Sequence, residues 1–469
     1  SSQVIALRPY QEEAREFLLT HPRSILADEP GVGKSYPAIE AGLATSSQKL
    51  LVVPSYLKYN WRRYLEEDYG LTGVVVADGE REQREEAIRS DSEWIIINYE
   101  MLARPMWDPE KKPGPAYEYL IKDNDTFRKG HEWGTVIFDE AHRLRGRNSL
   151  WTKAAYKVRS RYNWSLTGTP VVNNPGDFFP LLKMIDPKTF TSYWRFVRNY
   201  CWVEYNGFSW DVKHVRPEML RPFRELIYTY MLRRKLDDVL PDIPSQLETI
   251  IDVPLEPKWL KAHQEAKKNW VLEHPSIESV DIASIGELII TLRKITGVLS
   301  EAKLRATMDL IEDRQSEPIV VFVWFKDSGD RLYEEIQRKF KDRPVVYVSG
   351  DDPPQKRSHM VDQWRNAEGG PILIATIASL MEGENLQRAA HCIMYEEDYL
   401  PANNDQAVAR LRRSGQKRPV HVYHLHCTKT IDESVHRIAQ VRDTHTAKLY
   451  VEEVFADDDA SEFPTERGW

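Results

Sequence analysis

Residues 26–42 read LADEPGVGKSYPAIEAG, and this stretch decides the fold and much of the expected chemistry. The end of an apolar strand leads into a loop with Gly31 and Gly33, and Lys34-Ser35 then opens a helical pattern. Glycines let backbone N–H groups approach an anion, and a helix N-terminus adds positive potential. In such a loop the lysine reaches the β and γ phosphates, and the serine hydroxyl holds Mg²⁺. The stretch therefore predicts a site for a nucleoside triphosphate and Mg²⁺.

A second motif supports this interpretation. Asp28 stands where the strict GxxxxGK[ST] pattern has glycine, so the loop alone could also be a turn that contains Gly-Lys. However, TVIFDEAHRL at 135–144 is a buried-strand pattern that ends in Asp139 and Glu140, and ligands of open α/β sheets bind at the carboxyl ends of strands. A lone Asp-Glu is usually a solvated strand end. Together with a phosphate loop, it predicts that Asp139 holds Mg²⁺ and that Glu140 deprotonates the attacking water in phosphoryl transfer.

Short runs of apolar, often β-branched residues recur in two series. The first comprises SIL at 24–26, KLLVV at 49–53, GVVVA at 73–77, WIIIN at 94–98, TVIF at 135–138 and NWSLT at 163–167. The second comprises IVVFVWF at 319–325, PVVYVSG at 344–350, PILIAT at 371–376, HCIMYEE at 391–397 and PVHVYHLH at 419–426. Continuous apolar runs between helical patterns indicate strands buried on both faces, which is typical of parallel α/β sheets.

The two series predict two α/β lobes. The stretch at 240–257 is punctuated by prolines, and we interpret it as an extended connector. The segments at 175–235 and 257–315 are predicted to be helical decorations. The expected divisions are an N-terminal lobe at 1–240, a C-terminal lobe at 241–450 and a poorly ordered acidic tail at 451–469.

The composition is that of a globular protein, with 41% apolar and 29% charged residues among 469. The net charge of −8 gives no global basic signal, so a nucleic-acid surface has to be a local groove. Cys201, Cys392 and Cys427 lie far apart without CxxC spacing, which disfavours a disulfide framework and a zinc site. The longest apolar run is too short to cross a bilayer. We therefore expect no membrane partner and a cytoplasmic location.

Five segments, in this order, resemble the Swi/Snf class of helicase superfamily two. They are DEPGVGKS, FDEAH, SLTGTPVVNNP at 165–175, MLRRKLDDVLPDIP at 231–244 and DQAVARLRRSGQ at 405–416. The resemblance extends from about residue 7 to residue 440. It accounts for Asp28, because the phosphate loop of that class typically begins Asp-Glu. It implies an α/β fold of two RecA-like lobes, each a mostly parallel sheet flanked by helices, and ATP-driven translocation along duplex DNA.

The resemblance also implies site residues. LRPYQ with Gln11 resembles the segment that reads adenine. Contacts to ATP are implied for Gln11, Gly31, Gly33, Lys34, Ser35, Asp139 and Gly383, with Ser35 and Asp139 as the Mg²⁺ ligands. Gly383 lies in ATIASLMEGENLQ at 375–387, where Leu380 and Met381 occupy positions that usually hold glycines.

Arg410 and Arg413 match the two arginines of the last motif, which implies that they reach the γ phosphate during catalysis. Their spacing places them on one helical face. Without the other motifs, the same pattern would indicate a solvated basic helix.

The resemblance implies DNA contacts made mainly to phosphates, which position a protein without reading sequence. The predicted DNA-contact residues are Lys58, Asn60, Trp61, Asn98 and Thr169 in the first lobe and Lys326, Ser349 and Asn385 in the second. The alternative for Trp61 is a core aromatic, and the lysines could equally be solubilising surface charges. Thr167, Gly168 and Thr169 resemble the segment that couples the nucleotide site to DNA.

We interpret His142 as a hydrogen-bond partner in coupling and not as a metal ligand, because no second ligand is spaced to join it. The remaining histidines form no readable constellation.

The leading hypothesis is a monomeric DNA-stimulated ATPase that translocates on duplex DNA independently of sequence. Two alternatives remain, a strand-separating DNA or RNA helicase and a nucleotide-gated DNA-binding scaffold without turnover. No protein partner is identifiable, and we expect a compact bacterial or phage motor that acts in DNA repair or recombination.

Overall fold

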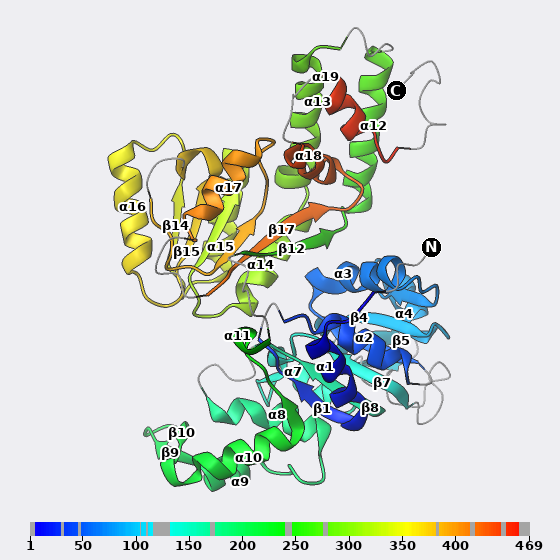
Figure 1. The fold of residues 1–469 in the computed structure, drawn as a ribbon, viewed down its shortest axis with the longest axis vertical. Helices are drawn as coiled ribbons and strands as arrows, with labels where there is room; N and C mark the ends of the chain where they lie inside the picture. Colours follow the sequence, from blue (N-terminus) through cyan, green and yellow to red (C-terminus); the bar gives the residue numbers. More distant parts are fainter. Residues whose placement is uncertain are drawn as a thin grey trace. The chain divides into compact units, whose positions relative to one another are not determined.

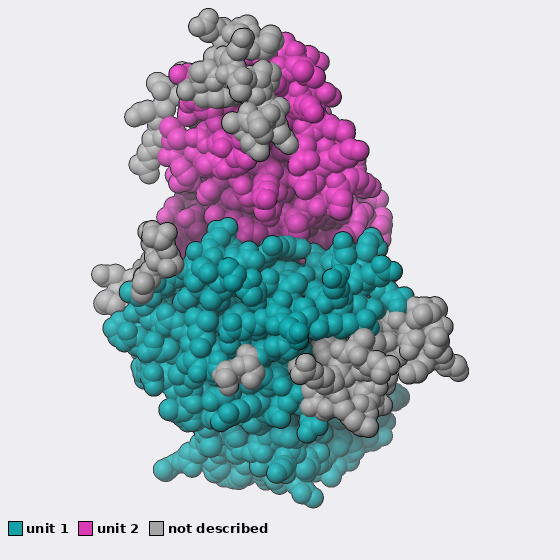
Figure 2. All heavy atoms as spheres, turned by 90° about the vertical axis from the view of Figure 1, so that its right-hand side faces the viewer, with its two compact units in different colours: residues 1–243 teal, residues 244–469 magenta. Residues whose placement is uncertain are grey.

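The computed structural model describes residues 5–29, 32–45, 48–103, 105–108, 111–115, 132–168, 174–239, 246–274, 280–380, 384–412, 418–441 and 447–458. The chain divides into two compact units, residues 1–243 and 244–469 (Figures 1 and 2). None of the helices in these described ranges combines the length and apolarity needed to cross a membrane.

Unit 1 is built on a parallel sheet of seven strands in the order β11-β1-β8-β7-β2-β4-β3. The strands are β1 (Arg23–Leu26), β2 (Lys49–Val53), β3 (Val74–Val76), β4 (Trp94–Asn98), β7 (Trp133–Phe138), β8 (Ser160–Leu166) and β11 (Met231–Leu232). All six predicted strands of the first series are present, and β11 is an addition at the edge beside β1.

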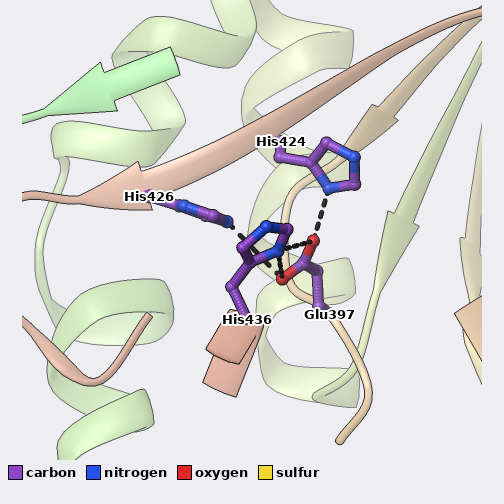
Figure 3. Close-up of side chains that lie close together, drawn as sticks. All are labelled: Glu397, His424, His426 and His436. Atoms are coloured by element: carbon purple, nitrogen blue, oxygen red, sulfur yellow. Dashed lines mark hydrogen bonds and ion pairs between the residues drawn. The ribbon is translucent and has the colours of Figure 1, made fainter. Parts of the chain in front are cut away.

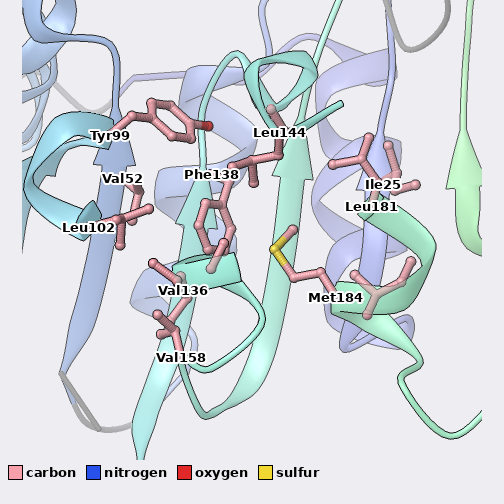
Figure 4. Packing of buried hydrophobic residues seen from close by; sticks show 14 of the residues in the cluster. Ile25, Val52, Tyr99, Leu102, Val136, Phe138, Leu144, Val158, Leu181 and Met184 are labelled. Atoms are coloured by element: carbon pink, nitrogen blue, oxygen red, sulfur yellow. The ribbon is translucent and has the colours of Figure 1, made fainter. Parts of the chain in front are cut away.

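Side chains on both faces of this sheet are buried. In β2, Leu50 and Val52 join one apolar cluster, and Leu51 and Val53 join another. Because successive side chains of a strand point to opposite faces, this alternation means that both faces are covered. Figure 4 shows part of the first cluster, in which Phe138 lies among side chains from the sheet and the covering helices. The continuous apolar runs in the sequence therefore follow from burial on two sides.

The helices of unit 1 that concern the site are α1 (Pro9–Thr20), α2 (Ser35–Leu43) and α3 (Lys58–Arg63). The others are α4 (Arg81–Arg89), α5 (Tyr99–Ala103), α7 (Leu150–Ala155), α8 (Phe178–Ile185), α9 (Tyr193–Tyr200), α10 (Leu220–Tyr230) and α11 (Leu236–Val239). A short antiparallel pair is formed by β5 (Pro105–Asp108) and β6 (Lys111–Pro115).

The expectation of a purely helical insertion at 175–235 is wrong in two places, because residues 231–232 form β11 and a hairpin lies earlier in the segment. An antiparallel hairpin of β9 (Cys201–Tyr205) and β10 (Trp210–Val215) interrupts the helices. Its turn contains Asn206-Gly207, with Gly207 at φ +95°. The Asn206 side-chain oxygen accepts hydrogen bonds from the backbone N–H groups of Phe208 and Ser209. Asn-Gly between aromatic and β-branched residues is a strong hairpin signal, which explains the difference.

Unit 2 contains a parallel sheet of six strands in the order β12-β17-β16-β13-β15-β14. The strands are β12 (Gln246–Val253), β13 (Ile319–Val323), β14 (Val345–Val348), β15 (Ile372–Thr376), β16 (His391–Met394) and β17 (Val420–Cys427). The helices are α12 (Pro257–Glu273), α13 (Ile282–Lys294), α14 (Ala302–Asp313), α15 (Lys326–Lys339), α16 (Pro354–Asn366), α17 (Pro401–Ala409), α18 (Ile431–Gln440) and α19 (Ala447–Val454). All five predicted strands of the second series are present.

The interpretation of 240–257 as a connector is wrong for residues 246–253. These residues form β12, which pairs in parallel with β17 over its whole length. Most β12 side chains are only half-buried, because β12 is an edge strand. Flanking prolines and this mixed polarity gave the segment the appearance of a linker.

The start of the predicted tail is folded. Helix α19 extends to Val454, and Val451, Val454 and Phe455 join the apolar cluster formed with α12, α13 and α18. The residues that follow Asp458 lie outside the described part of the chain.

Candidate functional site

The predicted phosphate loop joins β1 to α2. Lys34 is the residue before α2, and Gly33 adopts φ +88°, which side chains disfavour. A Cβ atom at Gly33 would lie 2.8 Å from Gln11 Nε2, and this amide donates a hydrogen bond to the Gly33 carbonyl at 3.4 Å. Gln11 and Gly33 are therefore in contact in the structure. Gly31 lies outside the described residues.

Asp28 has a structural partner that explains its place in the loop. Its carboxylate is buried and pairs with the Arg234 guanidinium, with Oδ2 2.6 Å from Nη2 and Oδ1 3.1 Å from Nε. The Arg234 backbone N–H also donates to Oδ1 at 2.8 Å. A bidentate pair of this kind fixes orientation as well as charge. Where the strict motif has a glycine, this chain thus has an anchor for the loop.

Sequence reasoning missed the role of the two arginines that follow β11. Arg233 Nη1 donates to the carbonyls of Ala27 at 2.7 Å and Gly168 at 3.3 Å. The Ala27 N–H donates to the Leu232 carbonyl at 2.8 Å, so β11 lies directly beside the start of the loop. The sequence does show two arginines directly after a short apolar segment. Their contacts with the phosphate loop follow only from the sheet order, in which β11 lies beside β1.

Lys34 lies within electrostatic reach of both predicted catalytic carboxylates. Its Nζ donates to the Asp28 carbonyl at 2.9 Å. Burial lowers the pKa of Lys34, and the negative charges of Glu140, Asp139 and Asp28 oppose that shift. The structure therefore brings the phosphate-loop lysine and the Asp-Glu pair together in unit 1.

Asp139 is held in place at the end of β7. Its Oδ2 accepts a hydrogen bond from Trp61 Nε1 at 2.8 Å, its Oδ1 accepts one from the Glu140 N–H at 2.9 Å, and its carbonyl accepts one from the Tyr99 hydroxyl at 2.6 Å. Burial and the neighbouring charge of Glu140 raise the pKa of Asp139 to about 7, although the Trp61 hydrogen bond and Lys34 oppose this shift. The two carboxylates face one buried lysine, so a divalent cation with a preference for oxygen ligands fits this excess of negative charge.

Glu140 and His142 extend the site toward the predicted coupling segment. Glu140 has a left-handed backbone with φ +50°, a conformation that non-glycine residues adopt rarely and often at functional sites. His142 Nδ1 lies 3.4 Å from Glu140 Oε2 and 3.1 Å from the Thr167 hydroxyl. His142 thus links FDEAH to LTG, in agreement with its interpretation as a hydrogen-bond partner.

Several predicted DNA-contact residues of unit 1 are buried. Asn60 and Trp61 are 0% and 1% exposed. Lys58 is also buried, pairs with Asp78 at 3.3 Å and donates to the Ala77 carbonyl. Asn98 donates to the Ser55 hydroxyl and to Glu100. The alternative for Trp61, a core aromatic, fits the structure better, because its polar atom is already bound to Asp139.

Of the predicted residues of unit 2, Lys326 and Ser349 lie just after strands β13 and β14, and Asn385 lies in the loop before β16. Lys326, at the start of α15, is half exposed and pairs with Asp351, whose N–H donates to the Ser349 hydroxyl. Asn385 caps its own turn by accepting from the Gln387 N–H at 2.9 Å. The structure thus brings Lys326 and Ser349 together.

The arginine motif lies at the end of α17. Arg410 is half-buried at this helix end, and its carbonyl accepts a hydrogen bond from the Leu386 N–H at 2.9 Å. Arg413, Thr169 and Gly383 lie outside the described residues.

Comparison with known protein families gives two matches. Residues 10–300 match the SNF2-related domain, and residues 302–415 match the helicase conserved C-terminal domain. The chain belongs to the SNF2-related family. The predicted family is confirmed, and the pair of domains is that of helicase-like enzymes that use ATP.

Curated relatives resemble nearly all of this SNF2-related chain. An uncharacterized ATP-dependent helicase of Mycoplasma pneumoniae is 25% identical over 96% of the chain, and the DNA annealing helicase and endonuclease ZRANB3 of Mus musculus is 24% identical over 91% of it. The chain spans only 43% and 39% of the lengths of these relatives.

A solved structure confirms the fold class. The Sulfolobus solfataricus SWI2/SNF2 ATPase core in complex with dsDNA matches with a TM-score of 0.64 over 98% of this chain and 96% of that one, at 22% sequence identity. The two parallel sheets of the SNF2-related chain are therefore those of two RecA-like lobes.

Proposed function

We propose that this chain is a DNA-dependent ATPase that translocates on duplex DNA. The observation that carries the proposal is the Asp139-Glu140 pair at the end of β7, within electrostatic reach of Lys34 in the phosphate loop. A pair of carboxylates beside a buried lysine at a strand end suits phosphoryl transfer to water, which depends on positioning and charge neutralisation.

In the proposed reaction, Lys34 and the loop backbone bind the β and γ phosphates of ATP. Ser35 and Asp139 would hold Mg²⁺, which would neutralise phosphate charge. Glu140 orients a water molecule and removes its proton as oxygen attacks the γ phosphorus, and ADP and phosphate leave. Trp61 and the Glu140 N–H keep the Asp139 carboxylate in one orientation.

We extend the proposal to the parts of the site that unit 2 supplies. Arg410 and Arg413 are proposed to reach the γ phosphate during turnover, so that hydrolysis requires both lobes. Gln11 would contact adenine and Gly383 the nucleotide.

The DNA assignment rests on the relatives. One solved relative is a SWI2/SNF2 ATPase core in complex with dsDNA, and another relative is named a DNA annealing helicase. We propose phosphate contacts from Lys326, Ser349 and Asn385, and from Asn98 and Thr169 in unit 1. Because the side chains of Asn60 and Trp61 are buried, we propose that α3 contacts DNA through its backbone. Trp61 would then link this contact to the ATP site through its hydrogen bond to Asp139. A monomeric state, a bacterial or phage source, and a cytoplasmic role in repair or recombination stay predictions.

Translocation is tested by displacement of a third strand from a duplex, with a forked duplex as the parallel substrate. We expect ATP-dependent displacement of the third strand, no separation of the fork, and DNA affinity that falls steeply with salt. Separation of the fork would establish the strand-separating helicase instead. DNA binding without displacement and without ATP hydrolysis would establish the scaffold.

A further inference from the structure

Four side chains from three segments of unit 2 converge on one point (Figure 3). Glu397 follows the end of β16, His424 and His426 lie on β17, and His436 lies on α18. His424 and His426 are two residues apart on one strand, so they point to the same face. This convergence contradicts the expectation that the remaining histidines form no constellation.

The separations suit a small cation with four ligands. One nitrogen from each histidine and a carboxylate oxygen of Glu397 all lie within 4.8 Å of one another. His426 Nε2 lies 3.5 Å from Glu397 Oε2, and His436 Nδ1 lies 3.1 Å from it. With Zn–N bonds of about 2.0 Å, two ligands of a tetrahedral zinc ion lie about 3.3 Å apart. The cluster therefore needs only small adjustments to enclose such an ion.

The inner atoms of the cluster are sheltered and directed inward. Glu397, His424 and His426 are at most 8% exposed, whereas His436 is 26% exposed at its side chain. Among the described residues, His424 Nδ1 and His426 Nε2 are buried, and both are directed at the Glu397 carboxylate. Buried ring nitrogens in this state are suited to bind a metal. The exposed edge at His436 offers a path of entry.

A second carboxylate orients one of the rings. Glu248 Oε1 on β12 lies 3.2 Å from His424 Nε2, which leaves His424 Nδ1 facing Glu397. Histidines that bind metals commonly donate their other ring nitrogen to a carboxylate in this way.

Other charged groups also lie near the cluster. Asp432 and Glu433 contribute negative charge beside His426, Lys303 pairs with Asp432, and Arg293 donates to the Glu397 carbonyl. Lys303 and Arg293 offset part of this negative charge, whereas the carboxylates of Glu397 and Glu248 contact the imidazoles directly and favour a cation there.

We propose that Glu397, His424, His426 and His436 bind one Zn²⁺ ion in unit 2. Three imidazoles and one carboxylate form a tetrahedral set that suits zinc and other late first-row divalent metals, whereas Mg²⁺ and Ca²⁺ take mainly oxygen ligands. Four protein ligands leave no position for a reacting water, so the ion is structural. This site is separate from the ATP site and does not depend on the proposed function.

The ion would connect segments that position the arginine motif. Glu396, next to Glu397, accepts hydrogen bonds from the N–H groups of Trp324 and Phe325 directly before α15. On the other side, Asp398 accepts bonds from Leu400 and Asn403 at the start of α17. A metal at Glu397 would thus stabilise the segment between β16 and α17, together with β17 and α18.

The alternative is a metal-free network in which the histidines share the Glu397 carboxylate. Burial by itself lowers the pKa of His424, but the contacts with Glu248 and Glu397 outweigh this effect and raise that pKa to about 9. A positive His424 beside Glu397 balances charge without an ion. The two accounts differ in zinc binding, which can be measured directly.

The test uses the full chain, purified without a histidine tag, stripped with chelator and titrated with Zn²⁺ against a fluorescent zinc indicator. We expect one Zn²⁺ per chain, a higher melting temperature of unit 2 with zinc, and the visible spectrum of tetrahedral cobalt when Co²⁺ replaces zinc. His426→Asn and His436→Asn should each weaken binding by at least about 10-fold. His359→Asn, at an exposed histidine of α16, is the matched control and should bind as the wild type does.

His436→Asn keeps the test informative if changes at the buried histidines impair folding, because His436 lies at the exposed edge. The proposal is overturned if the wild type binds no zinc at low micromolar concentration, or if His436→Asn and His426→Asn, both folded, bind zinc with wild-type affinity. In those cases the metal-free network is the correct account.

Discussion

The proposed ATP site of unit 1 and the histidine cluster of unit 2 both gather charged groups beside parallel strands. In unit 1, Asp139 and Glu140 lie near Lys34, and carboxylate oxygens are the candidate metal ligands. In unit 2, three imidazoles surround the single carboxylate of Glu397. Oxygen-rich sites suit Mg²⁺, whereas nitrogen-rich sites suit zinc. We therefore propose that the same kind of sheet edge holds a reacting cation in one unit and a structural cation in the other.

The two clusters also differ in how their charges are held. Asp139 is fixed by neutral donors from Trp61 and Tyr99, and Asp28 by the guanidinium of Arg234. In unit 2, the ligands themselves hold Glu397, with Glu248 behind His424. In unit 1, neighbouring side chains therefore fix the carboxylates that we propose to act in catalysis, whereas in unit 2 the members of the cluster hold one another.

The largest expected effect is at Glu140. Glu140→Gln keeps the shape of the side chain but removes the base, so ATP hydrolysis should fall by roughly 10²–10⁴-fold while nucleotide binding persists. Steady-state phosphate release and binding of a fluorescent ATP analogue measure the two quantities. Glu82→Gln, at an exposed position of α4, is the control and should change neither. Near-normal turnover of Glu140→Gln would show that Glu140 is not the general base.

The second prediction concerns the anchor of the phosphate loop. Arg234→Ala leaves the Asp28 carboxylate buried without its cation, which should lower the free energy of unfolding of unit 1 by about 3–5 kcal/mol. Hydrogen exchange of β1 during chemical unfolding reports this change. Arg221→Ala removes the exposed pair with Glu225 and should cost less than about 1 kcal/mol. Equal losses in the two variants would mean that the buried pair does not anchor the loop.

The third prediction separates two roles for Trp61. Trp61→Phe keeps the ring but removes the donor to Asp139, so turnover should fall by about 10-fold with and without DNA. DNA affinity and its salt dependence should stay as in the wild type. Lys326→Ala should instead weaken DNA binding and leave turnover without DNA unchanged. It should reduce the slope of the logarithm of DNA affinity against the logarithm of salt concentration by about 1. If Trp61→Phe instead weakens only DNA binding, the direct DNA contact predicted from the sequence is correct.

The last prediction concerns stability and not activity, and is a pH dependence in unit 2. His263 is buried and accepts a hydrogen bond from the Ile431 N–H at 3.1 Å. Burial and the charge of Lys267 lower the pKa of His263 from 6.5 to about 4, while Asp432 opposes the shift. Between these two pH values the unfolded chain binds a proton at His263 that the folded chain does not bind. The free energy of unfolding of unit 2 therefore decreases as the pH falls from about 6.5 to about 4.

The contribution of His263 to the slope of the free energy of unfolding against pH should be at most about 1.4 kcal/mol per pH unit. Urea unfolding of α12 and α18, followed by hydrogen exchange between pH 7 and about 4.5, measures it. A slope in His263→Gln as steep as that of the wild type would assign the pH dependence to other groups.

The sheets were predictable, and the candidate ATP site could be proposed from the sequence, because their signals are local. Short apolar runs mark strands buried on both faces, and DEPGVGKS and FDEAH each keep the proposed reacting groups within a few residues. The edge strand β12 was not predictable, because a half-buried strand between prolines resembles a linker.

Contacts between distant segments were the other limit. Arg234 is 206 residues from Asp28, and Glu397 is 39 residues from His436. His424 and His426 have the spacing of ligands on one strand face, but their partners become visible only when β16, β17 and α18 are placed together. Trp61 on α3 is likewise buried in an apolar cluster of unit 1, where its Nε1 reaches Asp139, which is 78 residues away in the sequence.

The central claim is that the Asp139-Glu140 pair hydrolyses ATP in response to duplex DNA. Its most direct test is steady-state ATP hydrolysis by the wild type with no nucleic acid, single-stranded DNA, duplex DNA or RNA. We predict stimulation by duplex DNA, lost in Glu140→Gln and in Arg413→Ala. Stimulation by RNA or single strands alone, or no turnover with any of them, would contradict the claim.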